Sequence, residues 1–227
     1  MMQRVKKALQ MTLPVCLGYV PLGIAFGVLL NDAGYGFWWS LLIASSIYAG
    51  SMQFVMVALL TGNDSLVSCA LLSFLLQSRH CFYGLSLIER YRRFHPLKRF
   101  YLIFSLTDET YSLMTSLQDQ PDYQDDEFVF LISLLNQSYW VTGCVLGSLA
   151  GNILPFDTAG IDFVMTALFI TIVVDQYRST ENHVPFWIGL LCGILCLFLF
   201  GPDRFLLAAL IGAVIVLILK GRGAAHA

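Results

Sequence analysis

Apolar stretches long enough to cross a lipid bilayer follow one another along most of this 227-residue chain. A hydrocarbon core of about 30 Å needs about 20 apolar residues of α-helix. The loops between the stretches are short and leave no room for a separate soluble domain, so residues 1–227 are predicted to form one transmembrane domain. The predicted apolar elements are residues 13–30, 37–60, 66–88, 100–117, 128–149, 161–177, 184–200 and 205–219.

Charged residues make up only 12% of the chain, whereas a soluble domain carries about 25%. This scarcity excludes soluble enzymes, nucleic-acid-binding proteins and disordered linkers. The sequence contains no Walker loop, metal-ligand cluster or nucleophile elbow, so we expect neither an enzyme nor a cofactor. The six cysteines lie in apolar stretches and are predicted to pack as small hydrophobic residues.

The basic residues predict the topology, because short cytoplasmic loops collect Lys and Arg. Basic clusters occur at the N-terminus, in the loop 90–99 and at the C-terminus, so both termini and this loop are predicted to be cytoplasmic. Three apolar elements separate the first two clusters, and one of them must therefore enter and leave on the same side. The element 37–60 is the best candidate, because small and polar residues at 48–53 could break its helix.

The same reasoning applies after the basic loop. The element 100–117 is predicted to cross outward and to place the acidic stretch 119–127 outside, and 161–177 is predicted to be re-entrant. The result is an all-α polytopic membrane protein with about six full spans and two broken or re-entrant elements. Its halves, 11–117 and 128–219, would form an inverted repeat. In an alternative count, 161–177 spans fully and 100–117 lies on the inner surface.

A few ionisable residues remain at membrane depth, where charge is costly and usually functional. Arg79 lies near the middle of 66–88 and is either part of a structural ion pair or a counter-charge for a substrate carboxylate. His80 beside it is either a proton carrier or a packing residue. Asp108 and Glu109 interrupt 100–117 and could pair with Arg79, bind a substrate ammonium or proton, or be hydrated near a helix end. For Asp175 we favour an interfacial helix end.

Breaks in the apolar helices offer a second kind of binding group. Pro21 and Gly23 are predicted to break the first element, and residues 48–53 the second. Half-helix N-termini can hold a carboxylate and freed carbonyl groups an ammonium, although close helix packing through small residues explains the same pattern. The candidate binding residues at the second break are Tyr48, Gly50, Ser51, Gln53 and Phe54.

Four motifs of this chain resemble the AzlC family, the large subunits of bacterial branched-chain amino acid exporters. They are Leu13-Pro14 with the Gly/Pro run that follows, the segment from Tyr48 to Phe54, the segment from Arg79 to Leu87, and the segment from Leu106 to Thr110. The resemblance implies export of branched-chain amino acids together with a small membrane subunit of the AzlD type.

The combined hypothesis is a secondary transporter of the bacterial inner membrane that exports valine-like zwitterions in exchange for protons. The substrate carboxylate is assigned to Arg79 or to the N–H groups of the broken helix, and the ammonium to Asp108 or Glu109. Aromatic residues such as Phe54 and Tyr83 would contact the aliphatic side chain. The alternatives are a membrane scaffold that does not transport and a channel-like pore.

Overall fold

The structure of the chain is a computed structural model. It describes residues 2–62, 66–153, 182–201 and 205–224, with the isolated positions 167, 170, 173–174 and 177–178. Within these residues all regular secondary structure is helical, as predicted. The chain forms two compact units, Met1–Asn63 with Gln77–Thr166, and Asp64–Leu76 with Ala167–Ala227.

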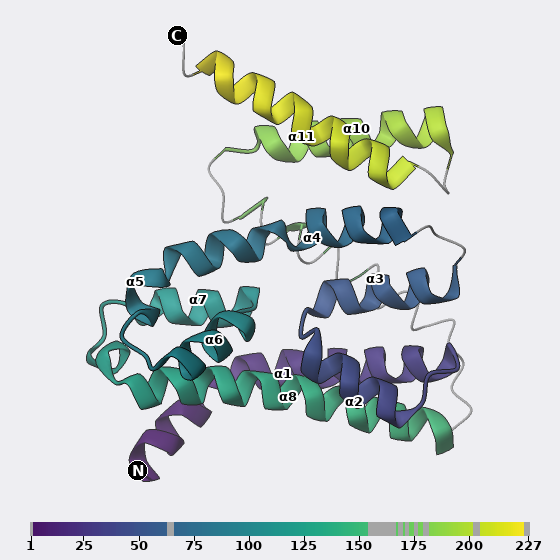
Figure 1. Cartoon of the computed structure of the whole chain (residues 1–227). Coiled ribbons are helices and arrows are strands. Elements are labelled where there is room, and N and C mark those ends of the chain that lie inside the picture. Colours follow the sequence, from purple (N-terminus) through teal and green to yellow (C-terminus); the bar gives the residue numbers. More distant parts are fainter. Residues whose placement is uncertain are drawn as a thin grey trace. The chain divides into compact units, whose positions relative to one another are not determined.

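Two long helices, α1 (Met2–Asp32) and α8 (Asp126–Ile153), form the centre of the first unit and lie side by side (Figure 1). Among the described helices, these two are long and apolar enough to cross a membrane. Their backbones touch through glycine: a methyl group at Gly27 would lie 2.1 Å from the Cys144 carbonyl oxygen, and one at Gly147 would lie 2.1 Å from that of Ile24. Small residues permit this close approach, which is typical of membrane helices.

The helix α1 continues through Pro21 and Gly23, so the break predicted at these residues is wrong. Proline lacks the N–H group that would bond the carbonyl of the preceding turn, yet α1 continues past it and packs along α8. Gly23 takes part in that packing, because a methyl group there would lie 2.9 Å from the Cys144 amide nitrogen.

The element predicted at 37–60 is broken, as the sequence indicates. It forms α2 (Phe37–Ser46) and α3 (Gly50–Thr61), and α3 runs back against the direction of α2 (Figure 1). The turn lies at residues 47–49, where Tyr48 adopts a positive φ of 34°, a conformation that L-residues rarely adopt. Helices of this length extend about 15–18 Å, so neither one alone spans a hydrocarbon core.

A second break was not predicted. After α4 (Leu66–Ser86) and the short α5 (Ile88–Tyr91), the chain forms α6 (Pro96–Phe104) and α7 (Asp108–Ser116). These two helices replace the single outward-crossing element expected at 100–117, and α7 runs back beside α6 (Figure 1). Ser105 is the C-cap of α6. Thr107 is the N-cap of α7, because its side chain accepts a hydrogen bond from the Thr110 amide.

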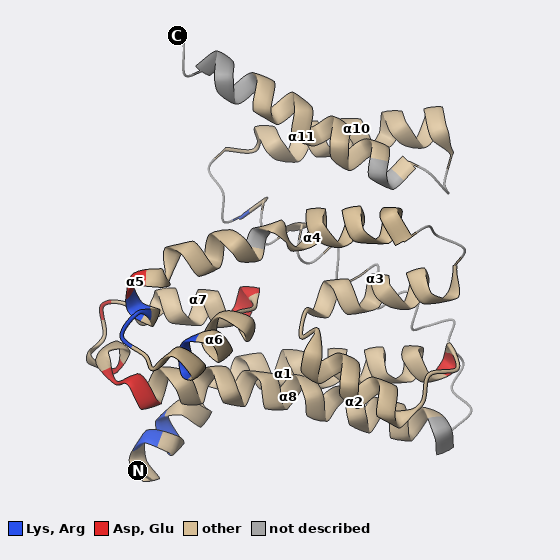
Figure 2. Ribbon diagram, viewed as in Figure 1, with Lys and Arg blue, Asp and Glu red and all other residues tan. Residues whose placement is uncertain are grey.

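The return of α7 places the acidic stretch at the same end of the unit as the basic N-terminus (Figure 2). Arg4 pairs with Asp125 at 2.7 Å, and Lys7 pairs with Asp122. Arg90 pairs with Asp126 at 2.6 Å. The prediction that 119–127 lies on the opposite side is therefore wrong, and the alternative count, in which 100–117 stays on the inner side, agrees better with these ion pairs.

The inverted repeat stays a prediction, because most of 161–177 lies outside the described residues.

This arrangement can be tested by labelling of single cysteines at Gln3 and Gln124, introduced into a background without the six native cysteines. Both positions are exposed and lie close to the ion pairs of Arg4 and Lys7. A membrane-impermeant maleimide is expected to react with both positions in vesicles of the same orientation, either inside-out or right-side-out. Labelling of the two positions from opposite sides would contradict the fold described above.

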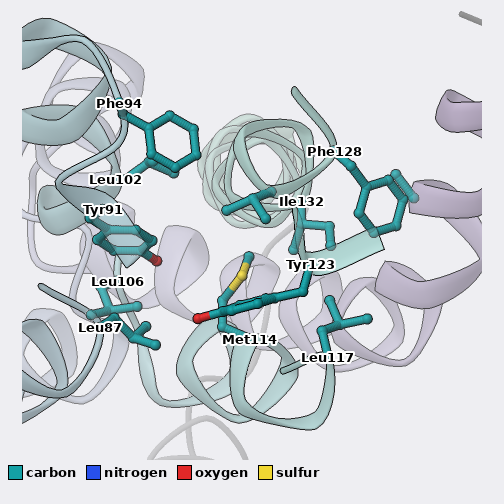
Figure 3. Packing of buried hydrophobic residues seen from close by; sticks show 12 residues of the cluster. Leu87, Tyr91, Phe94, Leu102, Leu106, Met114, Leu117, Tyr123, Phe128 and Ile132 are labelled. Carbon is teal, nitrogen blue, oxygen red and sulfur yellow. The ribbon is translucent and has the colours of Figure 1, made fainter. Parts of the chain in front are cut away.

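A hydrophobic cluster fills this end of the first unit, between the η1 turn (Pro121–Gln124), α8 and the segments from α4 to α7 (Figure 3). Arg90 is only 6% exposed. Its guanidinium lies 5.0 Å from the Phe94 ring centre and 5.3 Å from that of Tyr123, and it donates to the Tyr123 carbonyl at 2.9 Å. Burial raises the pKa of the Tyr91 and Tyr123 phenols, so both stay uncharged at neutral pH.

In the second unit, α10 (Val184–Phe200) packs on α11 (Phe205–Ala224). A largely apolar cavity of about 750 Å³ lies along α10 and includes Gly189 and Gly193 in its lining. Cys192 and Cys196 are half-buried free thiols of this apolar helix. The predicted interfacial residue Asp175 lies outside the described residues.

Candidate functional site

The two helix breaks meet beside the middle of α1, at Tyr19. The Tyr19 hydroxyl lies 2.7 Å from Thr107 Oγ1 and donates to Glu109 Oε2 at 2.6 Å. Tyr48, from the break between α2 and α3, is 3% exposed and lies near Glu109. We call this junction the break site; its residues are Tyr19, Tyr48, Gln53, Thr107, Glu109, Thr110, Asn136 and Trp140.

On one side of the break site, polar contacts continue from α7 into α8. Thr107 Oγ1 donates to Thr110 Oγ1 at 3.1 Å, and Asn136 Nδ2 donates to the same Thr110 oxygen at 3.0 Å. Thr110 and Asn136 are both fully buried. Buried polar groups at membrane depth are expensive unless they are hydrogen-bonded, so this network fixes the start of α7 against α8.

On the other side, Gln53 holds the break between α2 and α3 in place. Its side chain donates to the Ile43 carbonyl at 3.1 Å and accepts from Trp140 Nε1 at 2.7 Å. The Trp140 ring in turn packs edge-on against Tyr19, with ring centres 5.4 Å apart. Gln53 is therefore a positioning residue in this structure, since its amide bonds protein groups on two other helices.

The α3 helix begins at Gly50 without a side-chain cap. The first N–H groups of a helix have no acceptor within the helix, and they form the positive end of the helix dipole. A methyl group at Gly50 would approach the Trp140 ring to 3.2 Å, so the glycine lets the start of α3 lie against α8. This end of α3, with Gly50 and Ser51, is suited to an anionic group such as a carboxylate.

Phe54 is fully buried and packs edge-on against Phe26 of α1, with ring centres 5.7 Å apart. It therefore contributes to the contact between α1 and α3. The predicted role of Phe54 at the substrate side chain stays a prediction.

The end of α4 packs against α7 through aromatic rings. The His80 ring contacts Tyr83 at 5.7 Å between centres, and Tyr83 stacks on Tyr111 of α7 at 4.4 Å with an interplanar angle of 14°. The side chain of Arg79 lies outside the described residues, so its predicted pairing with Asp108 or Glu109 stays a prediction. Asp108 begins α7 and is half-buried, whereas Glu109 is exposed at the surface of the unit.

Tyr19, Thr107, Thr110 and Trp140 were not among the predicted site residues. Tyr19 lies in an apolar run rich in glycine and proline, where a tyrosine resembles a packing residue. A signal was present for Asn136, which stands out as a polar residue of 128–149. Among the described residues, no group of three or more His, Cys, Asp or Glu side chains is arranged to hold a metal ion.

Comparisons with known proteins identify relatives over most of the chain. The family model described as AzlC protein matches residues 14–154. An uncharacterized membrane protein of Helicobacter pylori is 40% identical over 94% of this chain and 93% of its own length. The branched-chain amino acid transport protein AzlC of Bacillus subtilis is 34% identical over 93% of this chain and 83% of its own length. The inner membrane protein YgaZ of Escherichia coli is 29% identical over 75% and 72%. No solved structure matches.

Proposed function

Because the chain belongs to the AzlC family, we propose that it is a secondary transporter that exports branched-chain amino acids in exchange for protons. The family and the relatives, named as membrane and transport proteins, support a membrane location and a role in transport. The substrate class follows the printed name of the B. subtilis relative. The direction of transport follows the family resemblance described in the sequence analysis, and the proton coupling is our inference from the break site.

The observation that carries the proposal is the position of Glu109 at the junction of two broken helices. Transporters commonly bind their substrates near the bilayer midplane, where half-helices end. A zwitterion needs a cation site and an anion site close together. Glu109 is assigned to the substrate ammonium, and the uncapped start of α3 at Gly50 and Ser51 to the carboxylate. The rings of Tyr19 and Trp140 lie between these groups and offer apolar contact.

Proton exchange follows from the chemistry of the same carboxylate. An ionised Glu109 can hold an ammonium group, whereas a protonated one cannot, so the proton and the substrate compete for one site. Such competition is sufficient for exchange when the site opens alternately to the two sides of the membrane. Arg79, on α4, remains the predicted additional counter-charge for the substrate.

We further propose that the chain works with a small membrane subunit of the AzlD type, in the bacterial inner membrane, with both termini in the cytoplasm. The helix α10 is apolar throughout, and none of its residues is buried within the described part of the chain. Its surface is thus available to lipid or to another membrane helix.

Transport by purified protein tests the proposal. The chain and its small subunit are reconstituted in liposomes loaded with labelled valine, and efflux is measured with and without a pH gradient. We expect valine efflux that is faster with an opposing proton gradient and saturates with valine. Flux that ignores the gradient and does not saturate would identify a pore, and no flux from correctly inserted protein would identify a scaffold.

A further inference from the structure

The cavity of about 750 Å³ along α10 is separate from the break site. All of its lining residues belong to the second unit. On α10 the lining extends from Pro185 to Leu197, a rise of about 18 Å for an α-helix. The cavity is therefore long in relation to its volume and follows one face of this helix.

Two glycines of α10 leave space for the cavity. Gly189 and Gly193 lie about one helical turn apart and both line it. No atom lies within 4 Å of the position that a methyl group at either residue would occupy. This differs from Gly27 on α1, where the facing helix takes that position. A larger side chain at Gly189 or Gly193 would thus project into the cavity.

The cavity has a polar end and an apolar body. Asn182 and His183 line it just before α10 begins, and the lining residues on α10 itself are apolar. The His183 ring stacks on Tyr177 with ring centres 3.9 Å apart, and Trp187 nearby is 52% exposed. Aromatic residues at the end of an apolar helix are typical of the headgroup level of a bilayer. The cavity therefore begins at the membrane surface and extends into the hydrocarbon region.

The lining also restricts the class of occupant. The lining residues, all within the described part of the chain, include no Asp, Glu, Lys or Arg, so the cavity lacks the paired charges that a zwitterionic amino acid needs. A transmembrane helix about 10 Å wide and about 30 Å long occupies about 2,400 Å³, which exceeds the volume of the cavity. A lipid acyl chain is apolar and much narrower than a helix. The bilayer can supply one, because none of the residues of α10 is buried within the described part of the chain.

We propose that this cavity binds one phospholipid, with an acyl chain along Gly189 and Gly193 and the headgroup at the polar end. Phe205 and Leu210 of α11 also line the cavity. The lipid therefore contacts α10 and α11 together and stabilises the second unit. This inference does not rest on the proposed transport function.

The test is native mass spectrometry of the full chain, purified in detergent and titrated with palmitoyl-oleoyl phosphatidylglycerol. The wild type is expected to retain one lipid more tightly than any further lipid. Gly189→Leu and Gly193→Leu place a branched side chain in the cavity and are expected to weaken this first binding by about 10-fold or more, because overpacking is unfavourable. The same lipid should raise the melting temperature of the wild type but not that of these two variants.

Gly212→Leu is the matched control. Gly212 lies on α11, also has no atom within 4 Å of an added methyl group, and is not among the residues that line the cavity in the described part of the chain. This variant should bind the lipid as the wild type does. Equal retention of the lipid by Gly189→Leu and Gly212→Leu would overturn the proposal. So would leucine variants that keep the lipid but lose the small subunit or stabilisation by valine. Transport is not measured, so a failure of valine efflux would leave this result unaffected.

Discussion

Replacing Glu109 by glutamine is expected to reduce proton-driven valine efflux by about 10- to 100-fold, because a hydrogen bond to a charged group contributes about 1.5–3 kcal/mol. The variant keeps the size of the side chain and a donor for the Tyr19 oxygen, so it should insert and fold. It loses both the charge that holds the substrate ammonium and the group that binds the proton. The measurement is efflux of labelled valine from liposomes, normalised to the amount of inserted protein.

The matched control is Glu89→Gln, since Glu89 is an exposed glutamate of α5, away from the break site. It is expected to transport at the wild-type rate. Asp108→Asn distinguishes the two acids that the sequence left as alternatives, and it should reduce efflux less than Glu109→Gln, because it is Glu109 that accepts the hydrogen bond from Tyr19. Wild-type efflux by a well-inserted Glu109→Gln protein would remove Glu109 from the transport mechanism.

The helices of this fold were largely predictable from apolar length, and the first break was predictable from its residues. Small and polar residues interrupt 37–60, and the structure breaks within that element at residues 47–49. The second break was missed, although its signal is present in the sequence. Thr107 followed by Asp108 and Glu109 is typical of a helix N-terminus, but we expected one unbroken element over 100–117, with the acids as charges within it or hydrated near its end.

The side on which the acidic stretch lies was not predictable, because acidic residues carry little topological information. Its position depends on ion pairs with Arg4, Lys7 and Arg90, whose partners are distant in sequence. The same limit applies to the break site. Glu109 is a conspicuous acid in an apolar run, whereas its partner Tyr19 lies 90 positions away and becomes a site residue only when α1 packs beside α7.

Replacing Gly27 or Gly147 by alanine is expected to destabilise the first unit by about 1–3 kcal/mol, because overpacking a tight contact forces the backbones apart. The added methyl group would lie 2.1 Å from a carbonyl oxygen of the facing helix in either case. A carbonyl oxygen of a helix cannot rotate away as the end of a flexible side chain can. The two helices must therefore separate, and the break site loses its alignment, since Tyr19 belongs to α1 and Asn136 and Trp140 to α8. The expected result is a strongly reduced melting temperature and a low yield of monodisperse protein.

Gly18→Ala is the control on the same helix, because no atom lies within 4 Å of the position that its methyl group would occupy. Alanine favours a helix interior over glycine by about 1 kcal/mol, so this variant should melt at or slightly above the wild-type temperature. Equal melting of Gly27→Ala and Gly18→Ala would show that α1 and α8 do not touch through their backbones. If instead only Gly27→Ala and Gly147→Ala lose stability, the glycines of 13–30 and 128–149 act in helix packing. The breaks at residues 47–49 and 105–107 then remain as the candidate binding groups at membrane depth.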